Sequence, residues 1–105
     1  SLHDALPIFA DKGDPFSLHI IEICAIELGR CLSLLIDLLN PDAIVIGSIY
    51  QRNVDLFLPT LKRIITFEAL PHAAENCRIL PSALGDAIGD YAAVSVGYMG
   101  LKNEL

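Results

Sequence analysis

The feature that most constrains this chain is a short, uninterrupted apolar run, Ala43-Ile44-Val45-Ile46. The run follows Asn40-Pro41 and ends at Gly47-Ser48, so it predicts a strand that is buried on both faces and stops at a tight turn. Such a strand belongs inside an α/β sheet, where ligands bind beyond the carboxyl ends of the strands. Because a glycine there lets the backbone approach a ligand closely, Gly47 and Ser48 are the candidate ligand-binding residues.

A second interpretation of these residues stays open, and pattern alone favours it. Gly47 then only permits an unusual φ, and Ser48 and Asn53 begin the next helix. Further along the chain, the segment Gly85-Asp86-Ala87-Ile88-Gly89 resembles a phosphate-binding loop only weakly. It lacks the lysine of a P-loop and the three-glycine spacing of a dinucleotide fingerprint.

The length and composition indicate one domain that packs against something else. A chain of 105 residues can build one modest core but not two. Its residues are 53% hydrophobic and 19% charged, which predicts that another domain or subunit covers one surface. The net charge of −6 and the scattered basic residues argue against nucleic-acid binding by this segment.

The cysteines and histidines form no CxxC pair and no cluster, so the sequence predicts no metal site. Two thiols lie in an apolar helical pattern, which predicts that they behave as small buried hydrophobes in a reducing, cytoplasmic compartment. No apolar run is long enough for a membrane span, so we expect no membrane association. The residues concerned are Cys24, Cys31, Cys77, His3, His19 and His72.

A long helix is predicted from Pro15 to about Leu39. Asp14 can cap the free N–H groups of its first turn, and a proline at the first helical position loses no hydrogen bond. Its apolar residues cover much of its circumference, which predicts burial on more than one side. Gly29 predicts a close approach of another backbone, most simply that of a small-residue helix near the C-terminus.

The sequence after Leu39 predicts a β-α-β unit followed by that small-residue helix. Since crossovers through a helix join parallel strands, we expect the two strands to be parallel. Asp86 and Asp90 are expected at the start of the last helix as a cap and a dipole-stabilising residue, rather than as catalytic acids. The predicted segments are a helix over Arg52–Leu70 with Pro59 in an early turn or at a kink, a polar loop at Glu75-Asn76, a strand over Cys77–Leu80, and a helix within Leu84–Gly97.

The order of these segments resembles the carboxyl-terminal part of the ROK family of sugar kinases and sugar-responsive repressors. The resemblance covers roughly residues 8–97. Its most specific parts are Leu39-Asn40-Pro41 before Ile44-Val45-Ile46-Gly47, and Leu84-Gly85-Asp86 followed by Gly89.

This resemblance implies an α/β fold that is part of a ribonuclease-H-like lobe of an actin-like ATPase. ATP and a hexose would lie in a cleft between this lobe and a missing amino-terminal lobe. We expect residues 13–105 to form the carboxyl-terminal lobe fragment. Residues 1–12 are expected to be a separate N-terminal segment that is partly foreign, since Ser1–Pro7 does not match the family.

By position, Gly47 and Ser48 match the Gly-Gly pair that the family places next to the nucleotide. Ser48 departs from that pattern, so its side chain is expected to narrow the adenosine site or to replace a backbone contact. The family's phosphate loop, catalytic Asp, sugar-binding Glu and His, and Cys-rich zinc motif have no counterpart in this chain. We therefore expect no catalytic residue here and no tightly bound ATP or Mg²⁺ on the chain alone.

The leading functional hypothesis is a fragment of an ATP-dependent, glucokinase-like hexose kinase that uses Mg²⁺. The alternative is a fragment of a sugar-responsive transcriptional regulator or non-enzymatic sugar-binding protein of the same fold. A third is an α/β interaction domain whose apolar first helix is a subunit surface. We expect the isolated chain to form a homo-oligomer, because its long apolar helix has too few partners.

Overall fold

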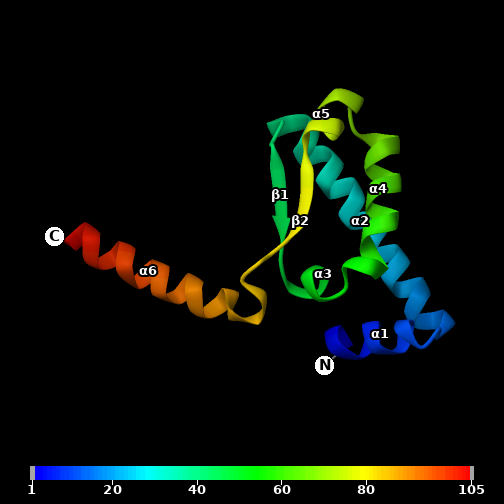
Figure 1. Ribbon diagram of the computed structural model, residues 1–105, viewed down its shortest axis with the longest axis horizontal. Coiled ribbons are helices and arrows are strands. Elements are labelled where there is room, and N and C mark those ends of the chain that lie inside the picture. Colours follow the sequence, from blue (N-terminus) through cyan, green and yellow to red (C-terminus); the bar gives the residue numbers. More distant parts are fainter. Residues whose placement is uncertain (1, 105) are drawn as a thin grey trace.

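The computed structural model describes residues 2–104, and the side chains of residues 4–103. Helices α2 and α4 and a small sheet form the body, while α6 runs away from it (Figure 1). No described helix is long and apolar enough to cross a membrane. In chain order the elements are α1 (Leu2–Asp11), α2 (Pro15–Leu39), β1 (Ala43–Ile46), α3 (Ser48–Arg52), α4 (Val54–Glu68), α5 (Pro71–Asn76), β2 (Arg78–Pro81), the 3₁₀ turn η1 (Gly85–Ala87) and α6 (Ile88–Glu104).

Helix α2 begins and ends as its sequence predicts. The Asp14 carboxylate accepts hydrogen bonds from the Ser17 backbone N–H at 2.8 Å and from the Ser17 hydroxyl at 2.7 Å. Pro15 occupies the first turn. Asn40 ends the helix in the left-handed conformation, with φ 47°, and its N–H donates to the carbonyl of Ile36. The long helix over Pro15–Leu39 is therefore confirmed.

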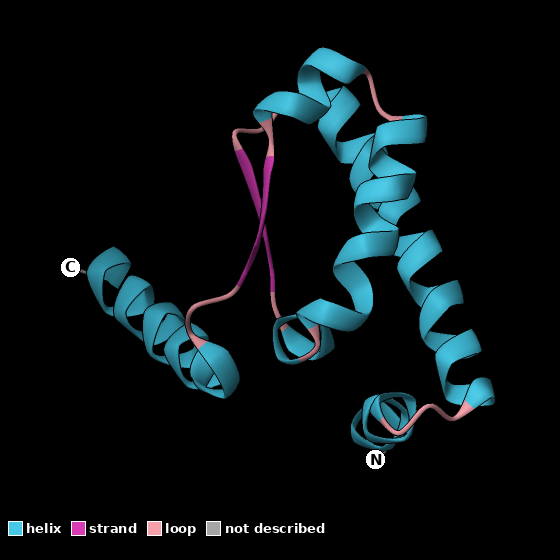
Figure 2. Ribbon diagram, turned by 45° about the vertical axis from the view of Figure 1, so that its right-hand side comes forward, coloured by secondary structure: helices cyan, strands magenta, loops and turns pink. Residues whose placement is uncertain are grey.

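The sheet consists of β1 and β2, which pair in parallel with Ile44 opposite Ile79 and Val45 opposite Leu80. The β-α-β unit is confirmed. The prediction that β1 is buried on both faces is wrong, because Val45 is 62% exposed. Ile44 and Ile79 pack against the core on the other face. Figure 2 shows the reason: the body helices lie on one side of the sheet, and no described helix lies directly against the other.

The core lies between α2 and α4, which come very close at Gly29. A Cβ at this position would lie 2.8 Å from the Cβ of Ile64. A close neighbour of Gly29 is therefore present, but it is the Ile64 side chain of α4, and not the backbone of the small-residue helix that the sequence predicted. Hydrogen bonds also join the same two helices. The Glu22 carboxylate of α2 accepts one from the Thr60 hydroxyl and one from the Arg63 guanidinium of α4, both at 2.7 Å.

Helix α6 is the predicted small-residue helix, but the prediction that it lies against the sheet or α2 is wrong. The described side chains of its last sixteen positions are exposed, and it packs mainly against η1. The thiols of Cys24 and Cys31 are also exposed, contrary to prediction. The apolar pattern of α2 covers more of its circumference than α1, α4 and α5 can cover, so these thiols lie on an open side.

Helices α1 and α5 were not predicted, and neither was the separation of α3 from α4. Residues 2–11 form α1 although Pro7 interrupts them. The loop expected at Glu75-Asn76 belongs to α5, which Pro71 starts from its first turn. The predicted Arg52–Leu70 helix is confirmed as α4, shorter at both ends, and it contains Pro59 within its second turn.

We predict that Gly29→Ala destabilises the body. Overpacking against Ile64 costs roughly 1–3 kcal/mol, and the gain in helix propensity of about 1 kcal/mol offsets only part of it. We expect a net loss of about 1 kcal/mol in the free energy of unfolding, measured with urea. The matched control is Gly97→Ala, where a Cβ meets nothing within 4 Å. It should raise helix content, and equal effects of the two substitutions would contradict the packing assignment.

We also predict that the Asp14 cap stabilises α2 only while its carboxylate is ionised. The hydrogen bonds from Ser17 lower the pKa of Asp14 below its ordinary value of 3.8. Its contribution is therefore complete above pH 3.8 and is lost as the pH falls through the lower pKa of the folded state. Asp14→Ala should lower stability at neutral pH and have little effect in strong acid. A loss that is independent of pH, in urea unfolding at several pH values, would show that the cap is not responsible.

Candidate functional site

The carboxyl ends of β1 and β2 lie side by side at one end of the sheet. Ile46 is opposite Pro81, and the Ser82 N–H continues the pairing by donating to the Ile46 carbonyl at 2.9 Å. Gly47 and Ser48 therefore emerge next to Ser82. This is the end of a parallel sheet at which ligands bind in open α/β folds.

Gly47 is partly buried and has an ordinary backbone, with φ −98°. A Cβ added to it would lie 3.5 Å from Ile88 Cδ1 and 3.6 Å from Gln51 Oε1, which are ordinary contacts. The unusual φ expected of Gly47 belongs instead to Ser48, whose φ is 57°. Ser48 does begin α3 and Asn53 directly precedes α4, so that part of the second interpretation is confirmed.

Two polar atoms near this end are buried without a hydrogen-bond partner in the described structure, the Tyr50 hydroxyl and Gln51 Oε1. Burial raises the pKa of Tyr50. The ring of Tyr50 packs edge-on against Phe57, with centroids 6.1 Å apart. Sequence reasoning missed both residues. Gln51 follows Gly47 by one helical turn, but that spacing has meaning only once α3 is known to be a helix of its own.

Arg52 links α3 to two acidic residues distant in sequence. Its guanidinium is 3.2 Å from the Asp4 carboxylate and 3.9 Å from that of Asp86. Asp86 lies inside η1, so it is not the N-cap of α6 that the sequence predicted. Asp90 does lie in the first turn of α6.

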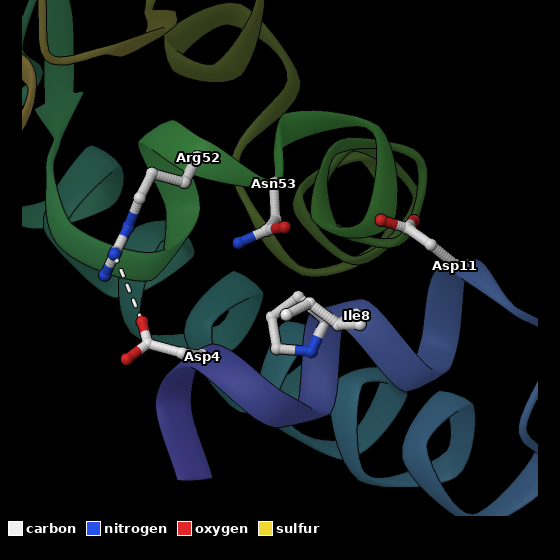
Figure 3. A pocket seen from close by; sticks show the side chains of 6 residues that line it. Asp4, Ile8, Asp11, Arg52 and Asn53 are labelled. Carbon is white, nitrogen blue, oxygen red and sulfur yellow. Dashed lines mark hydrogen bonds and ion pairs between the residues drawn. The ribbon is translucent and has the colours of Figure 1, made fainter. Parts of the chain in front are cut away.

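Beside Arg52 is a small cavity between α1 and α3, of about 190 Å³, where Asp4, Ile8, Asp11 and Asn53 line the wall (Figure 3). A larger cavity of about 620 Å³ lies between α4, α5 and β2. Cys77 lines it, and burial and the nearby Asp42 raise the pKa of this thiol. Neither cavity includes Gly47 or Ser48. Among the described residues, no three His, Cys, Asp or Glu side chains gather in a way that could hold a metal ion.

Comparison with curated proteins finds relatives of two kinds. Glucokinase of Halalkalibacterium halodurans is 32% identical over 80 residues, which cover 76% of this chain and 24% of that protein. The DNA-binding transcriptional dual regulator NagC of Escherichia coli is 32% identical over 87 residues, 81% of this chain and 21% of the regulator. The repressor Mlc of Escherichia coli is 30% identical over 76 residues, 72% of this chain and 19% of the repressor. The chain thus spans less than a quarter of the length of each.

A solved structure has the same fold over most of the chain. It is described as a ROK family transcriptional regulator, a homologue of the Escherichia coli Mlc protein. The superposition has a TM-score of 0.69 at 25% sequence identity and covers 77% of this chain and 20% of that one. No family model matches this chain. The curated relatives and this structure together point to the ROK family.

Proposed function

We propose that this chain is the carboxyl-terminal lobe segment of an ATP-dependent hexose kinase of the ROK type, with an actin-like ATPase fold. In this proposal Gly47 and Ser48 form part of the wall of the nucleotide site. The chain supplies backbone contacts and the core of its lobe. The phosphate loop, the base that deprotonates the sugar hydroxyl and the groups that hold Mg²⁺ belong to the rest of the protein.

The observation that carries this proposal is that the fold does not require a glycine at position 47. Its φ of −98° is open to any residue. A Cβ there would meet its neighbours at ordinary van der Waals distances. A glycine that neither backbone geometry nor packing requires, at the carboxyl end of a parallel strand, is best explained by a ligand that approaches the backbone.

A second candidate function is a sugar-responsive regulator of the same fold, and Ser48 favours it. The side chain of Ser48 is exposed at the strand end, in a left-handed conformation with φ 57° that glycine adopts more easily. A nucleotide that needs close backbone contact at this position would meet that side chain. The relatives NagC and Mlc are themselves regulators.

We predict that Gly47→Ala weakens nucleotide binding without destabilising the fold. In the protein that carries this segment, the unfolding free energy should stay within about 0.5 kcal/mol of wild type. The affinity for Mg²⁺·ADP should fall about tenfold, and further in Gly47→Val, while hexose binding changes little. Calorimetry with each ligand measures this. Gly97→Ala, where a Cβ meets nothing within 4 Å, is the matched control, and equal losses for nucleotide and hexose would count against the assignment.

Ser48→Gly distinguishes the two candidate functions. The substitution relieves a left-handed conformation that costs a non-glycine residue roughly 1 kcal/mol, partly offset by the greater freedom of glycine in the unfolded chain. For a kinase we expect tighter Mg²⁺·ADP binding in the same calorimetric assay, with hexose-dependent ATP turnover at least preserved. A protein that binds hexose, but binds no nucleotide with either residue at position 48, would be the regulator.

A further inference from the structure

Gln51 carries an unpaired oxygen next to the candidate ligand-binding backbone. Its side-chain Oε1 is buried and has no hydrogen-bond partner among the described residues. The atom lies 3.6 Å from the position that a Cβ of Gly47 would occupy. Most buried polar atoms in proteins are hydrogen-bonded, because an unpaired one destabilises the folded state. An unpaired acceptor at the carboxyl end of a parallel strand, where ligands bind in open α/β folds, indicates that a ligand supplies the missing donor.

The surroundings of this oxygen suit the nucleoside of a nucleotide and not its phosphates. The three atoms nearest to the Cβ position at residue 47 belong to uncharged side chains, those of Ile88, Gln51 and Ser82. Arg52, in the same helix as Gln51, already faces two carboxylates. An ionised phosphate offers acceptor oxygens only, so it cannot pair with Oε1. The base and the ribose carry N–H and O–H groups that can.

We propose that Gln51 recognises the nucleoside, and that its Oε1 accepts a hydrogen bond from an N–H of the base or an O–H of the ribose. This inference rests on the proposed nucleotide site at Gly47. Ile88 Cδ1 lies 3.5 Å from the same Cβ position, but Ile88 is 41% exposed, so its side chain can turn into solvent and admit the ligand to the buried oxygen. Gln51 then determines specificity, because a nucleotide without a donor at this place leaves the oxygen unpaired.

Calorimetry with nucleotide analogues tests this hydrogen bond in the protein that carries the segment. Mg²⁺·IDP lacks the amino group of adenine, and the Mg²⁺ complexes of 2′-deoxyADP and 3′-deoxyADP each lack one ribose hydroxyl. We expect the wild-type protein to bind one of these analogues about tenfold more weakly than Mg²⁺·ADP, which is the effect of one hydrogen bond. Gln51→Met removes the acceptor and keeps the length of the side chain, so it should bind that analogue and Mg²⁺·ADP equally well. The analogue concerned identifies the donor as the base or the ribose.

Tyr50→Phe is the matched control, because it removes the other buried polar atom that has no partner in the described structure. Tyr50 is a core residue and is only 1% exposed. Both substitutions should raise the urea midpoint of the ligand-free protein, since each removes an unpaired buried atom. Only Gln51→Met should abolish the discrimination between Mg²⁺·ADP and the analogue, and Tyr50→Phe should retain it.

Three results would overturn the role of Gln51. The wild-type protein could bind every analogue as tightly as Mg²⁺·ADP, or Gln51→Met could leave the discrimination unchanged. A urea midpoint that falls in Gln51→Met would show that the rest of the protein already supplies the donor. Gly47→Ala separates this inference from the proposed function. If Gly47→Ala weakens Mg²⁺·ADP binding but the discrimination does not depend on Gln51, the nucleotide site stands and only the role of Gln51 fails. If neither substitution affects Mg²⁺·ADP binding, both proposals fail.

Discussion

The close approach of α2 and α4 at Gly29 is the contact on which the rest of the structure depends. Because Gly29 has no side chain, the Cβ of Ile64 can lie only 2.8 Å from the position that a Cβ of residue 29 would occupy. The bridge from Glu22 to Thr60 and Arg63 fixes the same two helices along their length. They become one layer, and the apolar side chains of Ile44 and Ile79 pack against it. Without this layer a two-stranded sheet would not be stable in water.

The same layer determines where the strands end. α2 leads into β1, and α4 leads through α5 into β2, so both strands run in one direction and finish at the same end of the sheet. Gly47, Ser48 and Ser82 meet there as a consequence of topology. The unpaired oxygen of Gln51 lies at the same place, 3.6 Å from the Cβ position of Gly47. A buried polar atom without a hydrogen-bond partner destabilises the folded state by about 1–3 kcal/mol. A ligand that donates a hydrogen bond to Gln51 Oε1 would remove this destabilisation.

Local sequence signals predicted the parts of the fold that depend on local chemistry. The cap at Asp14, the span of α2, the strand Ala43–Ile46 and the parallel pairing all follow from capping, apolar runs and crossover rules. Which elements pack against each other could not be predicted in this way. Gly29 signals a close neighbour, but a glycine carries no information about which helix supplies it. The same holds for the candidate site. The strand end at Gly47 was predictable from the sequence. The left-handed backbone of Ser48 and the unpaired oxygen of Gln51 were not, because both depend on α3 being a helix separate from α4.

Helix α6 meets the candidate ligand site at Ile88, its first residue. Its Cδ1 would lie 3.5 Å from a Cβ at position 47, so the start of α6 covers the backbone that the nucleotide is proposed to approach. The described residues in the rest of α6 are exposed, and the helix packs mainly against η1, so little packing against the body fixes its direction. Any part of the whole protein that holds α6 would fix that direction, and with it the position of Ile88 beside Gly47. Ligand binding at Gly47 would then depend on how α6 is held, because the side chain of Ile88 joins the two.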